Sequence, residues 1–214
     1  MEKLKSSITN MVLVLTGVAV VTGAILAYIN HVTEEPIKVQ KEKTLADGIK
    51  SVMGGGDLKV SKTDTVRQND AKGKELTYII YQTQDANNKD LGAAVESTTG
   101  GFGGDLKILV GFDPEGNILG YTLLEHAETP GLGAKADKWF QKGEKGDIIG
   151  KNPKEKLTVS KDGGKVDAIT ASTITSRAFL LAVNNAYSAY KATPVDANTG
   201  ATKQNADNNK ELKK

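Results

Sequence analysis

Cysteine is missing from this chain of 214 residues, and histidine occurs only twice, at His31 and His126. The absence of cysteine excludes disulfides, thiolate nucleophiles, cysteine-held iron–sulfur clusters and cysteine-ligated zinc. It also removes cysteine usage as an indicator of the redox compartment. Two histidines so far apart in sequence do not indicate a shared metal ion, and we expect no metal site.

An excess of charge of one sign is also lacking. The 28 basic residues nearly balance the 26 acidic ones, which gives a formal net charge of +2. No basic stretch is interleaved with aromatic residues, and this argues against nucleic acid as a partner. The length allows one ordinary domain with additional segments.

A long uncharged run lies near the N-terminus. No charged residue occurs from Ser6 to Asn30, and the part from Ile8 to Ile29 is mostly Val, Leu, Ala, Ile and Gly. A helix needs about 20 apolar residues to span a bilayer, whereas the apolar core of a signal peptide has roughly 7–15. We predict a single transmembrane helix. A cleaved signal peptide and a buried core helix are the alternatives.

The charges beside this run predict its orientation. Lys3 and Lys5 precede the run, and Glu34 and Glu35 follow it. Positive flanks favour the cytoplasmic side of a membrane. We therefore expect a cytoplasmic N-terminus and an extracytoplasmic soluble part.

A second helix is predicted after the span, from Glu34 to Met53. Pro36 suits its first turn, and the glycines from Gly54 to Gly56 end it. From Pro194 onward apolar residues almost vanish, so the C-terminal segment cannot bury enough surface to become ordered. The expected segments are a membrane anchor (1–32), a helical stalk (33–56), a soluble domain (57–193) and a disordered tail (194–214).

The soluble domain reads as an antiparallel sheet with helices. Apolar runs separated by turn sequences predict hairpins, and Asp113-Pro114-Glu115-Gly116 is such a turn. Helical spacing predicts two helices in the second half. The expected strands are 76–82, 91–97, 106–112 and 118–125, and the expected helices are 134–142 and 176–191. The fold class is therefore α+β.

Two sequence motifs carry chemical information. The first runs from Glu125 to Gly133, Glu-His-Ala-Glu-Thr-Pro-Gly-Leu-Gly, after a predicted strand. Gly131 and Gly133 let the backbone approach a flat ligand closely, because no Cβ intervenes. Glu128 and Thr129 can offer polar contacts to a ring edge.

The second motif is rich in hydroxyl groups and runs from Asp167 to Arg177, just before the last predicted helix. Free N–H groups and the dipole make a helix start a natural phosphate site. A hydroxyl there can also be esterified. The simpler alternative is a Ser/Thr-rich cap of an ordinary helix.

Together these motifs resemble the FMN-binding domain found in the G subunit of the Rnf electron transport complex. A relative is the C subunit of the sodium-pumping NADH:quinone reductase. The family's flavinylation motif reads Asp-x-x-(Ser/Thr)-Gly-Ala-Thr. Asp167, Thr170 and Thr173 fit it, while Ala171 and Ser172 replace Gly and Ala. The N-terminal span and the Gly-Gly-Phe-Gly-Gly sequence at residues 100–104 also resemble the family.

The resemblance implies a covalent flavoprotein. FMN would be joined through its phosphate to Thr173, which would act as an anchor and not as a catalytic nucleophile, with Thr175 as the alternative acceptor. A flavin transferase would attach the FMN from FAD, with Asp167 as part of what it recognises. Glu128, Thr129, Leu132 and Gly133 would line the isoalloxazine ring. The expected cofactor-binding residues are Glu128, Thr129, Gly131, Leu132, Gly133, Asp167, Thr170, Ser172, Thr173 and Thr175.

The resemblance also implies partners and a location. The chain would be a subunit, in the bacterial inner membrane, of a complex that links ferredoxin and NAD⁺ to Na⁺ or H⁺ transport. It would contact other membrane and peripheral subunits and relay electrons through its flavin. The competing hypothesis is an extracytoplasmic binding or assembly subunit without covalent flavin.

Overall fold

The computed structural model describes residues 8–69 and 75–192. Its Cα positions divide into two compact units, Met1–Thr44 and Leu45–Lys214. The predicted disordered tail and the two lysines before the apolar run lie outside the described residues.

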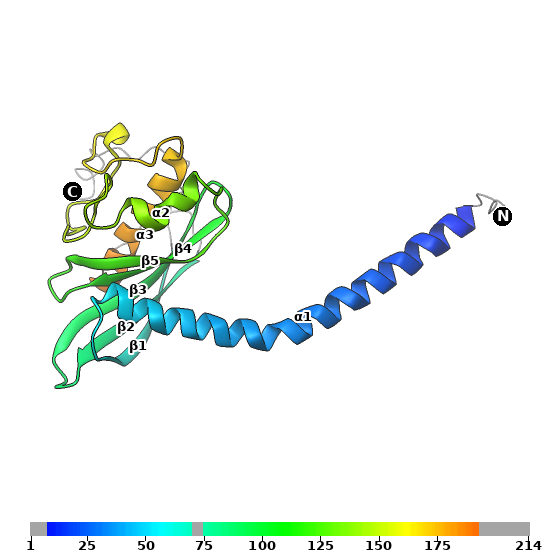
Figure 1. Cartoon of the computed structure of the whole chain (residues 1–214), viewed down its shortest axis with the longest axis horizontal. Helices are drawn as coiled ribbons and strands as arrows, with labels where there is room; N and C mark the ends of the chain where they lie inside the picture. The colour runs from blue at the N-terminus through cyan, green and yellow to red at the C-terminus, as the bar shows by residue number, and fades with distance from the viewer. Residues whose placement is uncertain (1–7, 70–74, 193–214) are drawn as a thin grey trace. The chain divides into compact units, whose positions relative to one another are not determined.

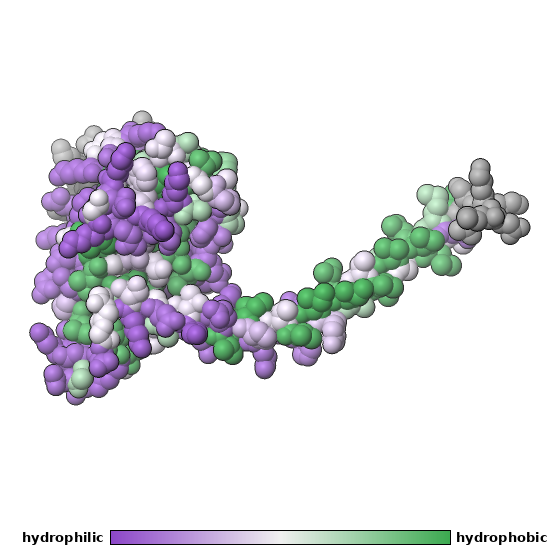
Figure 2. All heavy atoms as spheres, viewed as in Figure 1, coloured by the Kyte–Doolittle hydropathy of each residue, from purple (hydrophilic) through white to green (hydrophobic). Residues whose placement is uncertain are grey.

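One helix, α1 (Ile8–Val52), replaces the separate anchor and stalk helices expected from the sequence. The prediction that a new helix starts around Pro36 was wrong, because Pro36 lies inside α1. Proline's fixed φ is compatible with helical geometry, and its missing N–H removes only one hydrogen bond from a long helix. Residues 8–44 are exposed, and α1 is long and apolar enough to cross a membrane. Figure 2 shows apolar side chains around its N-terminal part.

The soluble unit is built on a five-stranded antiparallel sheet with the order β1-β2-β3-β4-β5 (Figure 1). The prediction of a sheet made of hairpins is confirmed, with each strand slightly longer than expected. The first strand escaped prediction because its residues are mostly polar and exposed, so pairing with β2 holds it in place more than burial does. The strands are β1 (Leu58–Asn69), β2 (Glu75–Asp85), β3 (Asp90–Gly100), β4 (Asp105–Phe112) and β5 (Ile118–His126).

Both faces of the central strands are covered within this unit. The last turns of α1 bury Ile49 and Val52 against Tyr81 and Leu109 on one face. The long helix α3 (Thr173–Tyr190) packs on the other face, mainly over β3 and β4 (Figure 1).

A cross-strand pair of glycines, Gly111 and Gly120, receives the end of α1. A Cβ at Gly111 would collide with the backbone carbonyl of Val52. The close approach of α1 to the sheet therefore requires glycine at this position.

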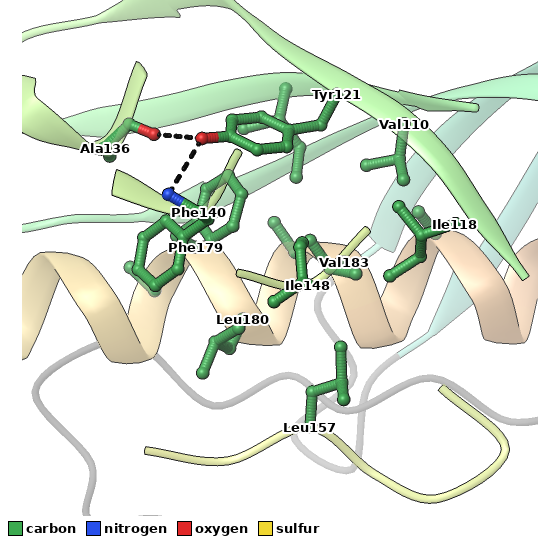
Figure 3. Packing of buried hydrophobic residues seen from close by; sticks show 14 of the residues in the cluster. Val110, Ile118, Tyr121, Ala136, Phe140, Ile148, Leu157, Phe179, Leu180 and Val183 are labelled. Carbon is green, nitrogen blue, oxygen red and sulfur yellow. Dashed lines mark hydrogen bonds between the residues drawn. The ribbon is translucent and has the colours of Figure 1, made fainter. Parts of the chain in front are cut away.

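The core between the sheet and α3 centres on three aromatic rings. Phe140 stacks on Phe179 with ring centroids 4.3 Å apart, and Tyr121 meets Phe179 edge-on at 4.7 Å. The Tyr121 hydroxyl donates to the carbonyl of Ala136 at 2.7 Å and accepts the N–H of Phe140 at 3.2 Å (Figure 3). Burial raises the pKa of Tyr121 strongly.

Three short helical turns complete the unit. They are η1 (Gly133–Lys135), α2 (Ala136–Trp139) and η2 (Ser160–Asp162). The helix expected over 134–142 is shorter than predicted, because the N–H of Phe140 bonds to Tyr121 instead of continuing the helix. The last helix begins three residues earlier than predicted, at Thr173, inside the hydroxyl-rich motif.

Candidate functional site

Glu128 ties the two sequence motifs together. It follows β5 and is only 6% exposed. One carboxylate oxygen accepts the backbone N–H of Phe102 at 2.7 Å, and the other accepts the hydroxyl of Thr175 at 2.8 Å. Charge-assisted hydrogen bonds of this kind are stronger than neutral ones. The β3–β4 loop, the segment after β5 and the start of α3 are thereby joined at one carboxylate.

Two glycines make room for this carboxylate. A Cβ at Gly101 would collide with one oxygen of Glu128, and a Cβ at Gly133 would collide with the other. Sequence reasoning expected Gly133 to let the backbone approach a ligand, whereas here it lets the backbone approach a buried side chain. Gly131, at φ +75°, has no atom within 4 Å of its ideal Cβ and faces open space.

The turn before α3 adopts a conformation that favours glycine. Ala171 has φ +60°, a left-handed geometry that an L-residue adopts at some cost. Ser176 fixes the turn, because its Oγ accepts the N–H of Ile169 and donates to the carbonyl of Ser172, each at 2.9 Å. A glycine at this position would adopt the same φ without that cost.

Asp167 holds the start of the hydroxyl-rich motif in two ways. Its backbone carbonyl accepts the indole N–H of Trp139 at 2.8 Å, and its carboxylate accepts the hydroxyl of Ser160 at 3.3 Å. The Asp167 residue itself is exposed, as is Thr170.

The candidate acceptor hydroxyls differ in accessibility. Thr173, the first residue of α3, is half-buried, and its Oγ1 accepts a hydrogen bond from Lys161 Nζ at 3.1 Å. Thr175 is only 1% exposed, and its hydroxyl donates to Glu128. Within the described residues Ser172 makes no side-chain cap bond to α3. Thr173 is thus open to a reagent while Thr175 is enclosed.

An ion pair anchors η2 to α3. Arg177 donates two hydrogen bonds of 2.7 Å each to the carboxylate of Asp162. The Asp162 side chain is fully buried, and its hydrogen bond raises the pKa of Arg177 above the ordinary value. The pair holds the turn carrying Lys161 beside the first turn of α3.

Two apolar side chains stand exposed on the loops that Glu128 connects. Phe102 is 68% exposed and Leu132 is 41% exposed. Thr129 is exposed beside Leu132, and its carbonyl accepts the Leu132 N–H at 3.2 Å. Sequence reasoning gave Phe102 and Lys161 no role. For Phe102 the signal was an aromatic residue enclosed by four glycines, but for Lys161 no sequence signal existed.

An open pocket of about 360 Å³ lies next to the loop after β5. Gly131 and Trp139 contribute to its wall, and Trp139 also bonds to Asp167. The lining residues are Gly131, Ala134, Lys135, Asp137, Lys138, Trp139 and Glu144.

Comparison with known proteins identifies the domain. Residues 101–188 match the FMN-binding domain family, and this range contains both motifs. The exposed apolar pair suits a flat aromatic ring. The free helix start with a lysine beside Thr173 suits a phosphate. The residues present therefore fit FMN.

Relatives match along most of the chain, and each is named as the G subunit of an ion-translocating oxidoreductase complex. The protein of Aliivibrio fischeri strain MJ11 is 33% identical over 84% of this chain and 88% of its own length. The Yersinia pestis protein is 34% identical over 75% of this chain and 79% of its own length. The Shewanella baltica protein is 32% identical over 78% of this chain and 82% of its own length. The resemblance inferred from the two motifs is confirmed, and the chain belongs to the family of G subunits of ion-translocating oxidoreductase complexes.

Proposed function

We propose that this chain is the electron-transfer subunit of an ion-translocating oxidoreductase complex and carries FMN as a phosphoester on Thr173. The choice of acceptor rests on one observation, the difference in burial between two hydroxyl groups. Thr173 is half-buried at the start of α3, whereas Thr175 is 1% exposed and donates to Glu128. Esterification of Thr175 would break that buried bond, and esterification of Thr173 leaves it intact.

The first turn of α3 would receive the phosphate. An 18-residue helix presents free N–H groups and the positive end of its dipole at Thr173, and both favour a phosphoryl group. Thr170 and Ser172 precede this position in the same motif. Asp167, six residues before Thr173 in the sequence, is exposed, which supports its role as part of the surface that the flavin transferase recognises.

The exposed side chains of Phe102 and Leu132 would contact the isoalloxazine ring. Their loops are fixed through Glu128 and Gly133, so the ring would meet a preformed surface. Thr129 and Gly131 border this surface on the segment after β5. Bound FMN supplies the one- and two-electron redox chemistry, and the protein places and tunes it.

The membrane arrangement follows from α1. One N-terminal apolar helix fits a single-pass protein in a membrane-bound complex. We propose a cytoplasmic N-terminus and an extracytoplasmic domain in the bacterial inner membrane, with the other subunits of the complex as partners. A covalent bond keeps the flavin where free FMN is too dilute to saturate a dissociable site. From Ser6 to Asn30 the chain has no charged residue, so we do not propose this subunit as the ion path.

The complex would pass electrons between ferredoxin and NAD⁺ and couple this to Na⁺ or H⁺ movement. This part of the proposal is supported by the family resemblance and by the name of the relatives, which describes an ion-translocating oxidoreductase complex.

Coexpression of the full chain with a flavin transferase tests the proposal. We expect flavin fluorescence on the band in a denaturing gel and a modified peptide that contains Thr173 in mass spectrometry. Thr173→Val should give a folded, dark protein, while Thr175→Val should stay fluorescent although less stable. Fluorescence retained in Thr173→Val but lost in Thr175→Val would move the attachment to Thr175. A dark, folded wild type would favour a binding or assembly role instead.

A further inference from the structure

The ammonium group of Lys161 is hydrogen-bonded to the Thr173 oxygen that would become esterified. Its Nζ donates to Thr173 Oγ1 at 3.1 Å, from a turn twelve residues earlier in the chain. Within the described residues Lys161 forms no ion pair, so the hydroxyl is the polar group that its charge faces. A lysine side chain on a surface is normally mobile, and its position here depends on how firmly the backbone of its turn is held.

Three sets of interactions hold that backbone. The N–H of Ser160 donates to the carbonyl of Val166 at 2.8 Å, and the N–H of Gly164 donates to Val159 at 3.0 Å. The next residue, Asp162, has its buried carboxylate locked to Arg177 on α3. The turn is therefore fixed to the helix that carries Thr173, and Lys161 starts from a defined point.

The direction of the hydrogen bond matters for chemistry. Because Lys161 donates to Thr173 Oγ1, the proton of the threonine remains free to leave with a base. The neighbouring carboxylate of Asp162 does not draw Lys161 away from Thr173, because it is already paired with Arg177. A positive charge beside the attacking oxygen also stabilises the negatively charged phosphate oxygens that must approach that oxygen.

We propose that Lys161 is the residue through which this chain assists its own flavinylation, by holding the transferred phosphate beside Thr173. The inference rests on the proposed function. In the transfer, Thr173 Oγ1 forms a bond to the FMN-side phosphorus of FAD, and the bond from that phosphorus to the bridging oxygen breaks. AMP leaves, and the hydroxyl proton passes to a base of the transferase. In the product, Lys161 faces the phosphodiester and neutralises its single charge.

The test measures the rate of flavin incorporation into the purified full-length apoprotein with transferase and FAD. Removing a donor from an oxyanion site costs about 10²–10³-fold; for this solvent-facing lysine we expect about 10-fold for Lys161→Met. Lys161→Arg should recover most of the rate, since it keeps the charge. The matched control is Lys165→Met, an exposed lysine four residues later, and it should load at the wild-type rate.

Two further readouts separate charge from structure. The difference between wild type and Lys161→Met should shrink as salt rises, because salt screens exposed charges, while the urea midpoint should be the same for both proteins. The ³¹P signal of the loaded phosphodiester should shift in Lys161→Met and not in Lys165→Met. If the wild type incorporates flavin and Lys161→Met incorporates it at the same rate, this inference alone is overturned. A wild type that never loads overturns the proposed function and this inference together.

Discussion

The hydroxyl of Thr175 donates to the carboxylate of Glu128 at 2.8 Å, although 47 residues separate the two in sequence. Each residue belongs to a different sequence motif. Because Thr175 lies two residues after Thr173 on the same helical turn, this bond sets the distance between the loop after β5 and the proposed acceptor. The two motifs therefore form one structural unit, and a change in either should affect the other.

Replacing Glu128 should destabilise the domain in a graded way. Glu128→Ala removes the acceptor of the Phe102 N–H and leaves the buried Thr175 hydroxyl without its partner, and an unsatisfied buried group costs about 1–3 kcal/mol. Glu128→Gln can keep one accepting and one donating contact, so its loss should be about 1 kcal/mol. The free energy of unfolding, measured by urea titration, should decrease in the order wild type, Glu128→Gln, Glu128→Ala.

Glu155 provides the control, since it is exposed on a loop away from both motifs. Glu155→Ala should change the unfolding free energy by no more than about 0.5 kcal/mol. Equal effects of Glu128→Ala and Glu155→Ala would show that the buried carboxylate does not join the motifs.

Sequence reasoning succeeded where periodicity and turn chemistry act locally. The strands from Leu106 and from Ile118 were predicted because apolar runs flank a Pro-Glu-Gly turn. The bonds from Glu128 to Phe102 and Thr175 could not be predicted, because they join residues 26 and 47 positions apart. For the same reason the Lys161 contact was missed, and Glu128 was expected to face a ligand although its carboxylate is enclosed by protein.

The proposed ring surface can be tested by comparing two exposed leucines. Leu132 is 41% exposed on the loop tied to Glu128, and Leu119 is 38% exposed on β5. In flavinylated protein, Leu132→Ser should expose the ring to water and shift the visible absorption and the midpoint potential of the flavin. Leu119→Ser has the same chemistry at an equally exposed site and should leave both properties unchanged. Identical spectra for all three proteins would place the ring elsewhere, and the pocket beside Trp139 would be the next candidate.

The turn at Ala171 predicts a stabilising substitution. An L-residue in left-handed geometry costs about 1–2 kcal/mol, whereas the extra freedom of glycine in the unfolded chain costs about 0.4–1 kcal/mol. Ala171→Gly should therefore raise the unfolding free energy by about 0.5 kcal/mol. Ala46→Gly, at an exposed position of α1, should lower helix stability, by up to about 1 kcal/mol. Destabilisation by Ala171→Gly would contradict the positive φ at this residue.

Each of the chain's two arginines forms an ion pair, and the two ion pairs differ in burial. Arg177 bonds to a fully buried Asp162, while Arg67 lies 3.6 Å from Glu75 with both side chains exposed. Arg177→Met leaves a buried charge without its partner and should cost about 3–5 kcal/mol. Arg67→Met should cost less than about 1 kcal/mol. Comparable losses in urea titrations would mean that Asp162 does not depend on Arg177.

Alkaline pH should weaken the fold through Tyr81. Burial, and secondly the nearby Glu96 carboxylate, raise the pKa of Tyr81 from 10.0 to about 12. The folded state therefore keeps a proton that the unfolded state releases from about pH 10 upward. The stabilisation is complete below pH 10 and is lost as the pH rises to 12. At 1.36 kcal/mol per pKa unit, and allowing for solvent screening, the total loss should be about 1–2 kcal/mol.

Tyr81→Phe removes this titration, so its unfolding free energy should fall less than that of the wild type between pH 9 and pH 11.5. Urea titrations at the two pH values measure the difference, and Tyr28→Phe, which removes an exposed hydroxyl from α1, should follow the wild type. Parallel losses in the Tyr81→Phe and wild-type proteins would show that the Tyr81 hydroxyl ionises as readily in the folded chain as in the unfolded one.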